Sequence, residues 1–187
     1  MVKPSKKSLK EWKDIANETM NLLLRRKIYR QFCEILEFNP ALNQNNCFIE
    51  IVKNDYVTVQ CMRIRRLFDD GDDDCLRLVT RLTEEEIVSS DEVDKLKETC
   101  KPIKDYARKH IAHKDKKRRK YIAGYPDLDK AIDTIHQVVM KSIRKTNKYS
   151  GVYTLDGTIQ DNWREIFYKA WISDWKKFLQ FTHDKGS

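Results

Sequence analysis

Glycine and proline are scarce in this chain, which has five of the first and four of the second among its 187 residues. Folds with many short strands need these residues in their tight turns, so their scarcity argues against an all-β protein. The odd number of well-separated cysteines, with no C-x-x-C pair, argues against a disulfide framework and favours reduced thiols. These cysteines are Cys33, Cys47, Cys61, Cys75 and Cys100.

Long apolar runs are also absent. No window approaches 18 consecutive apolar residues, so we expect no membrane span. The N-terminal sequence MVKPSKKSLKEW lacks the apolar stretch of a secretory signal. Together with the cysteine usage, these features predict a cytoplasmic protein without a membrane partner.

Charge, by contrast, is abundant: charged residues make up 35% of the chain, and the net charge is +8. High charge with few turn residues favours long, surface-charged helices. The excess of positive charge points weakly towards nucleic acid or another polyanion. The length suits one domain, which we place over residues 1–187.

In the first half of the chain, apolar residues recur at the three- to four-residue spacing of a helix. One apolar stripe runs from Leu9 to Leu36 and predicts a helix that ends before Pro40. A second stripe within 41–68 predicts another helix, although YVTVQC (56–61) alternates like a strand. The run DDGDDD (69–74) lacks the ligand order of a calcium loop, so we expect a turn whose Asp74 caps a short helix, CLRLVTRL (75–82).

The second half continues the pattern. A stripe from Val93 to His110 predicts a helix that is kinked or restarted at Pro102. The sequence GYPDLD begins another helix, and its stripe consists of Leu128, Ile132, Ile135, Val139 and Ile143. We expect a loop at 146–158 and then a last helix, capped by Thr158 and Asp161. Its apolar residues are Trp163, Phe167, Trp171, Trp175 and Phe178. The sequence thus predicts an all-α, single-domain bundle of five to six helices.

The stretch ARKHIAHKDKKRRK (107–120) has the most distinctive chemistry. His110 and His113 could share a helical face, but Asp115 is the only further local metal ligand, so we expect no metal and no cofactor. His110 falls on the apolar stripe and suits a packed histidine better than a functional one. His113 lies at the helix end, where the dipole favours a protonated imidazole. Arg108 lies about 140° from it around an ideal helix, so the two cannot meet within one straight helix.

A basic loop follows at 114–123. Six of the seven residues 114–120 are cationic, and they repel one another in a solvated loop, whereas contact with phosphates would release counterions. We therefore predict a nucleic acid as the ligand of this loop. The six cations are Lys114, Lys116, Lys117, Arg118, Arg119 and Lys120.

The pattern R-x4-H at a helix end resembles the HEPN superfamily, whose mark is R-x4–6-H. The fuller string YARKHIAHKD (106–115) is similar to the version of this motif found in abortive-infection HEPN domains. The segment RIRRLFDDGDDDCLRLVTRL (63–82) resembles the helix end and the leucine-rich helix of the same group. The resemblance covers 63–82 and 99–115, and the remaining chain has only a compatible helix pattern.

The resemblance implies an HEPN-like fold and a homodimer in which two Arg/His motifs face one cleft. It implies a metal-independent endoribonuclease that leaves 2′,3′-cyclic phosphate ends and acts as a toxin or phage-defence effector, with an antitoxin or regulatory protein as a further partner. Arg108 and His113 would be catalytic, with Tyr106, Lys109, His110 and Asp115 in support. An imidazole can move the hydroxyl proton, and a guanidinium can hold phosphate oxygens.

The chain departs from the related motif at one position. There the arginine follows the tyrosine directly, but here Ala107 occupies that position and Arg108 the next. Either Arg108 serves as the motif arginine, or the site is disabled, and the match of the remaining string favours the second slightly. Two other functions stay open: a non-catalytic HEPN module that binds RNA or a cognate regulator, and a basic helical adaptor with structural histidines.

Overall fold

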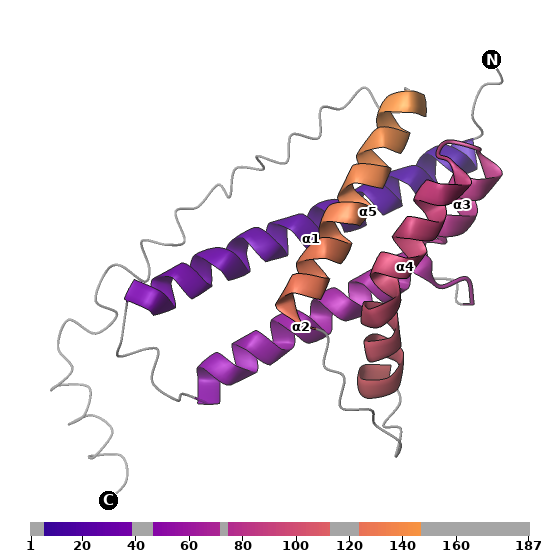
Figure 1. Cartoon of the computed structure of the whole chain (residues 1–187). Helices are drawn as coiled ribbons and strands as arrows, with labels where there is room; N and C mark the ends of the chain where they lie inside the picture. Colours follow the sequence, from indigo (N-terminus) through magenta and orange to yellow (C-terminus); the bar gives the residue numbers. More distant parts are fainter. Residues whose placement is uncertain (1–5, 39–46, 72–74, 113–123, 147–187) are drawn as a thin grey trace, which may run out of the picture.

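Figure 1 shows the chain as a computed structural model, which describes residues 6–38, 47–71, 75–112 and 124–146. These residues form α1 (Lys6–Phe38), α2 (Cys47–Phe68), α3 (Leu78–Glu84), α4 (Ser90–Tyr106), a π-helical turn η1 (Ala107–Ala112) and α5 (Tyr125–Thr146). No strand occurs among them. The predicted all-α bundle is therefore confirmed, and YVTVQC is part of a helix.

The long helices α1 and α2 lie antiparallel. Near one end Nη1 of Arg63 lies 2.8 Å from Oε2 of the buried Glu18, and further along Tyr56 stacks on Tyr29. Helix α5 crosses α1 and also packs against α4 and α2, while α3 lies beside α4 (Figure 1). Trp12 of α1 ties α3 to the bundle, since its Nε1 donates to Glu85 Oε1 at 3.0 Å, directly after α3.

The main core forms where the apolar stripes of all five helices meet. Every residue of the stripe predicted for α5 is buried there, as is the α4 stripe as far as Ala107. Its largest fully buried side chains are Trp12, Ile15, Leu22, Ile64, Leu67, Leu78, Leu82, Leu96, Ile103, Leu128, Ile132 and Ile135. A second, smaller cluster of Phe32, Leu36 and Ile49 lies between α1 and α2.

Local sequence explains two of the helix starts. At α4, Ser89 Oγ accepts from the N–H of Glu92 at 3.3 Å, and Glu92 Oε2 accepts from the N–H of Ser89 at 3.1 Å, a complete capping box. At α5, Pro126 lies in the first turn and Asp127 Oδ2 accepts from the N–H of Gly124 at 3.3 Å. The predicted start of α5 is thus confirmed.

One local prediction was wrong. The short helix begins at Leu78 rather than at Cys75, and its N-cap is Arg77 in the left-handed conformation (φ 50°), so Asp74 does not cap it. Of the two alternatives at Pro102, a kink or a restart, the restart does not occur: α4 runs through Pro102, although this proline lacks the N–H that would bond to the preceding turn. The change in winding comes later, at η1.

Other boundaries agree with the sequence. Helix α1 ends at Phe38, two residues before Pro40, and α2 ends at Phe68, directly before the acidic run. Thr146, predicted as the first loop residue, is the last of α5. The remainder of the predicted 146–158 loop, the basic loop 114–123 and the last helix lie outside the described residues.

Candidate functional site

The predicted motif lies where α4 passes into η1. The N–H of Ala107 donates to the carbonyl oxygens of Ile103 and Lys104, closing the last α turn. From Ala107 to Ala112 the backbone is a π-helix, which joins residues five apart by hydrogen bonds and is found often at functional sites. This turn packs against α2 as well as α4.

The two alternative arginine positions have opposite environments. Ala107 has 0% exposure and belongs to the main core, whereas Arg108 is exposed. An arginine at 107 would have to place its guanidinium among packed apolar side chains, which is costly without a partner. Of positions 107 and 108, only the second therefore presents its side chain to solvent, where a phosphate can reach it.

Three residues near Arg108 in the sequence are partly buried: Tyr106, Lys109 and Lys104. Tyr106 is half-buried against the core, and burial, with a smaller effect from the Cys61 thiol, raises the pKa of its phenol. Lys109 is also half-buried. Lys104 lies one turn before Arg108, with its Nζ 5.1 Å from the centre of the Phe68 ring.

The rest of the predicted site is not placed. The backbone of His110 belongs to η1, but its side chain lies outside the described part of the structure. The same holds for His113, Asp115 and the six cations Lys114, Lys116, Lys117, Arg118, Arg119 and Lys120. Their roles as catalytic, supporting and RNA-binding residues stay predictions.

Within the described residues, no group of three or more His, Cys, Asp or Glu side chains could hold a metal ion. Nor does any helix there combine the length and apolar character needed to cross a bilayer.

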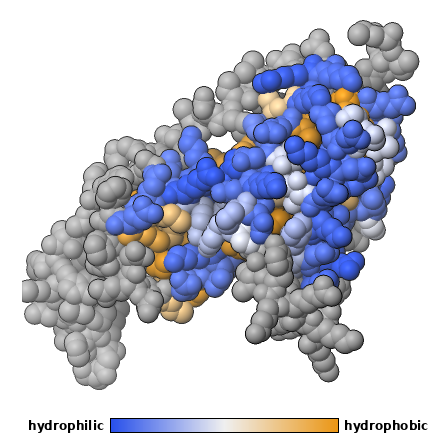
Figure 2. All heavy atoms as spheres, in the orientation of Figure 1, coloured by the Kyte–Doolittle hydropathy of each residue, from blue (hydrophilic) through white to orange (hydrophobic). Residues whose placement is uncertain are grey.

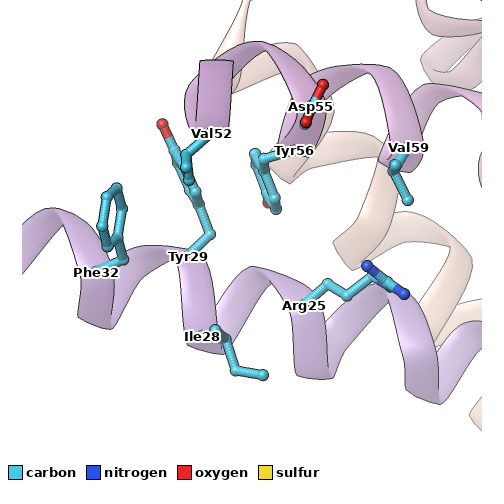
Figure 3. Close-up of a pocket in the computed structure, with 8 residues that line it drawn as sticks. All are labelled: Arg25, Ile28, Tyr29, Phe32, Val52, Asp55, Tyr56 and Val59. Carbon is cyan, nitrogen blue, oxygen red and sulfur yellow. The ribbon is translucent and has the colours of Figure 1, made fainter. Parts of the chain in front are cut away.

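A groove between α1 and α2 was not foreseen from the sequence. It has a volume of about 300 Å³, and Figure 3 shows its lining from both helices. The lining residues are Arg25, Ile28, Tyr29, Phe32, Val52, Asp55, Tyr56 and Val59. Each helix supplies residues spaced by three and four, which the sequence presents simply as part of an apolar stripe. Only the antiparallel pairing reveals that the two stripes leave a space between them.

Three tyrosines stack along one side of this groove. The rings of Tyr29 and Tyr56 are 3.8 Å apart and inclined by 3°, and the ring of Tyr125 lies 5.6 Å from that of Tyr29. The hydroxyl of Tyr29 donates to that of Tyr125 at 2.8 Å. Burial raises the pKa of Tyr29 and raises that of Tyr56 to about 12, so both phenols stay neutral. The stack joins the start of α5 to the groove.

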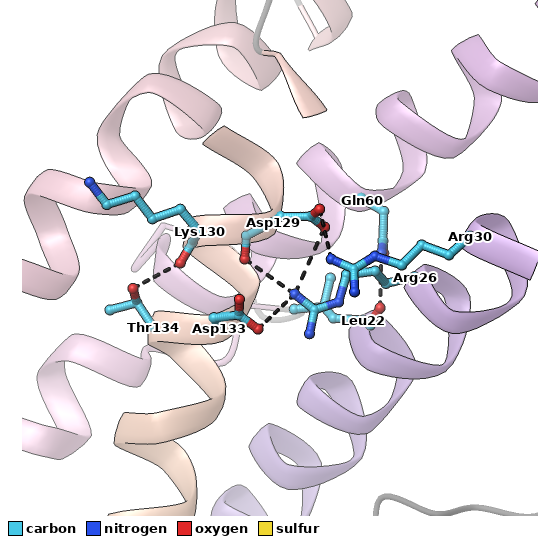
Figure 4. A network of polar contacts seen from close by, with 8 residues as sticks. All are labelled: Leu22, Arg26, Arg30, Gln60, Asp129, Lys130, Asp133 and Thr134. Atoms are coloured by element: carbon cyan, nitrogen blue, oxygen red, sulfur yellow. Dashed lines mark hydrogen bonds and ion pairs between the residues drawn. The ribbon is translucent and has the colours of Figure 1, made fainter. Parts of the chain in front are cut away.

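Beside the stack, charged residues join α1 to α5 (Figure 4). Nη1 of Arg26 lies 2.7 Å from Oδ1 of Asp133 and donates to the carbonyl oxygen of Asp129 at 3.3 Å. Arg30 donates to Oδ2 of Asp129 at 2.9 Å. Nearby, the buried Gln60 of α2 donates to the carbonyl oxygen of Leu22 at 2.9 Å. These contacts hold α1 against α5 and α2, and α1 and α2 form the groove.

Comparison of the chain with protein-family models, with curated proteins and with solved structures found no match.

Proposed function

We propose that this protein is a metal-independent endoribonuclease of the HEPN type that leaves 2′,3′-cyclic phosphate ends. The observation that carries the proposal is the contrast at the end of α4, where Ala107 is buried and Arg108 is exposed. This contrast supports Arg108 as the arginine of the R-x4-H pattern. It weighs against the interpretation that the chain has lost its arginine at position 107.

The winding of η1 adds a second argument. The separation of about 140° between Arg108 and His113 assumed an ideal α-helix. A π turn joins residues five apart, so continued π winding would bring the i and i+5 side chains closer to one face. The winding of residues 107–112 therefore reduces the geometric objection to an Arg108–His113 pair.

In the proposed reaction, the ribose 2′-hydroxyl attacks the adjacent phosphorus, and the bond from phosphorus to the 5′ oxygen of the next nucleotide breaks. The imidazole of His113 takes the hydroxyl proton and later releases it to water, while the leaving 5′ oxygen takes a proton from water. The guanidinium of Arg108 holds the phosphate oxygens while negative charge develops. The basic loop, with Lys116, Lys117 and Arg118 among its cations, would contact neighbouring phosphates. No step requires a metal or a cofactor.

We further propose that the protein acts in the cytoplasm as a homodimer, with the 107–120 segments of both chains near the two-fold axis. A toxin or phage-defence role would then require an antitoxin or another regulatory protein. Sedimentation should show a dimer at micromolar concentration. A monomer there would contradict a site shared between two chains.

The decisive experiment is incubation of RNA with the full chain in EDTA, followed by mass spectrometry of the product ends. We expect cleavage with cyclic phosphate ends, and its loss in Arg108→Ala. The matched control is Arg144→Ala, which removes one exposed arginine near the end of α5. Cleavage that survives Arg108→Ala would come from another residue or from a contaminating nuclease.

A second function is favoured by the alanine at position 107. If the motif requires an arginine there, the chain is a non-catalytic HEPN module that binds RNA or a cognate regulator. Salt-dependent RNA binding without cleavage, in the same EDTA experiment, would support this function over the first.

A further inference from the structure

The groove between α1 and α2 continues into an exposed apolar surface. Phe48 lies one helical turn before the lining residue Val52 and is 61% exposed. Ile51 is 50% exposed, and Ile28, in the groove wall, is 36% exposed. Apolar residues gather visibly at this end of the molecule in Figure 2. Several large apolar side chains exposed together mark a binding surface rather than ordinary scattered exposure.

The chemistry of the groove suits an apolar helix better than a small polar ligand. Its two charged lining residues, Arg25 and Asp55, are both exposed, so they lie at the rim. Small-molecule sites usually combine apolar walls with polar groups that converge on the ligand. An apolar groove between two antiparallel helices instead matches the recognition of an amphipathic helix through anchors spaced by three and four residues.

The chain itself contains such a helix in its sequence. Beyond Thr158, the predicted last helix has Trp163, Phe167, Trp171, Trp175 and Phe178, at intervals of four, four, four and three. At about 100° per residue these five side chains fall within an arc of about 120°. Each buried aromatic side chain removes roughly 150–250 Å² from water, so this face needs a large apolar partner surface.

The connection is long enough to reach the groove. Tyr125, the first residue of α5, stacks on Tyr29 in the groove wall. The 22 residues of α5 rise by about 33 Å, so the chain leaves α5 roughly that far from the groove. Trp163 follows Thr146 by 17 residues (163 − 146), which can span up to about 55–60 Å.

We propose that residues 159–178 dock as an amphipathic helix in the α1–α2 groove of the same chain, with their aromatic face against Ile28, Val52 and Val59. Tethering favours the same chain over a second copy, because a short linker holds the segment at an effective concentration in the millimolar range. The proposal does not depend on any nuclease activity.

Tryptophan fluorescence of the full chain tests this proposal. Three of the four tryptophans lie in the docking segment, and the fourth, Trp12, is fully buried in the main core. Val52→Glu places a charge in the groove, and Ile28→Glu does so at a more exposed position of the opposite wall. The control is Asn54→Glu, which adds the same charge to α2 at an exposed position about 200° round the helix from Val52.

We expect both groove variants to raise acrylamide quenching of tryptophan at least about twofold, with helix content retained by circular dichroism, while Asn54→Glu leaves quenching unchanged. Quenching that is the same in all variants would overturn the proposal. Light scattering on a sizing column separates the two possible sources of the segment. A dimer that both groove variants convert to monomer would assign the groove to a second copy and overturn docking within one chain.

Discussion

Nη1 of Arg26 and Oδ1 of Asp133 lie 2.7 Å apart, although 107 residues separate them in the sequence (133 − 26). The arginine side chain is 12% exposed, so its stem is packed while its guanidinium joins α1 to α5. Arg26→Ala should lower the free energy of unfolding by about 1–3 kcal/mol, since it removes charged hydrogen bonds together with packing. Urea denaturation measures this decrease.

Arg30→Ala is the matched control for that prediction. Arg30 lies one turn further along α1 and also pairs with α5, through Asp129, but its side chain is 58% exposed. Solvent weakens such a pair, so we expect a decrease of at most about 1 kcal/mol. Equal decreases in the two variants would show that burial of Arg26 adds nothing to the stability of the pair.

The second prediction concerns which arginine position is functional. Arg108→Ala should reduce RNA cleavage at least about a hundredfold, the effect expected when one electrostatic stabiliser is removed. The melting temperature should stay the same, because the side chain is exposed. Single-turnover cleavage assays and thermal melts of the same preparation give both quantities.

Ala107→Arg is the counterpart of that variant. Because Ala107 is fully buried, the added guanidinium should destabilise the fold by several kcal/mol and leave cleavage no faster. A stable variant that cuts RNA at least about a hundredfold faster would show instead that the natural chain has a disabled site.

The third prediction separates the two histidines. His113→Ala should abolish cleavage with little change in melting temperature, because we assign it the proton transfer. His110→Ala should mainly reduce stability, by about 1–3 kcal/mol, since it follows the buried stripe of α4. The opposite result would exchange the structural and catalytic assignments.

The fourth prediction tests the basic loop. Replacing Lys116, Lys117, Arg118 and Arg119 with Gln should weaken RNA binding, because fewer counterions are released when the RNA binds. The plot of log K against log salt should also become flatter, by about 0.7 for each phosphate of a single strand that the variant no longer neutralises. Filter binding at several salt concentrations provides the slope.

A control for net charge is needed, since four positive charges are removed together. A second variant replaces four exposed lysines of α1 and α4 with Gln, namely Lys10, Lys13, Lys27 and Lys95. If both variants flatten the slope equally, the basic loop has no special contact with phosphate.

The fifth prediction concerns pH. Burial lowers the pKa of His136, with Arg26 and Arg144 adding to the shift and Asp133 opposing it. The unfolded chain then binds this proton more readily than the folded one. The stability contribution is present above about pH 6.5, the ordinary histidine pKa, and is lost as the pH falls through the lower folded value.

His136→Gln should therefore reduce the fall in melting temperature between pH 7 and pH 5.5. The protonation of carboxylates changes little between pH 7 and pH 5.5, so the change in melting temperature over this range comes mainly from histidines. An unchanged pH dependence would mean that His136 titrates alike in the folded and unfolded chains.

Helices with a periodic buried face were predictable from the sequence, whereas a boundary set by one unusual backbone conformation was not. The stripe of α5 was predictable because burial on one face of a long helix repeats at the helical period, and Leu128, Ile132 and Ile135 all follow it. The start of α3 was not, because it depends on Arg77 adopting a left-handed conformation, which is uncommon for residues other than glycine.

The candidate site was predictable only in part. The R-x4-H spacing is visible in the sequence, and the burial of Ala107 follows the predicted stripe of α4, but the π winding of 107–112 has no sequence signature. The stack of Tyr29, Tyr56 and Tyr125 depends on three helices meeting, so no local pattern could indicate it. Long-range packing decides this stack.

The pairing of α1 with α5 also bears on how the protein is made. During synthesis, the apolar face of α1, with Trp12, Ile15 and Leu22, leaves the ribosome long before α5 can cover it. At roughly 5–20 residues per second, the 107 residues from Arg26 to Asp133 take about 5–20 s. For that interval the nascent chain presents the part of the α1 face that α5 later buries, a natural substrate for chaperones that bind growing polypeptides.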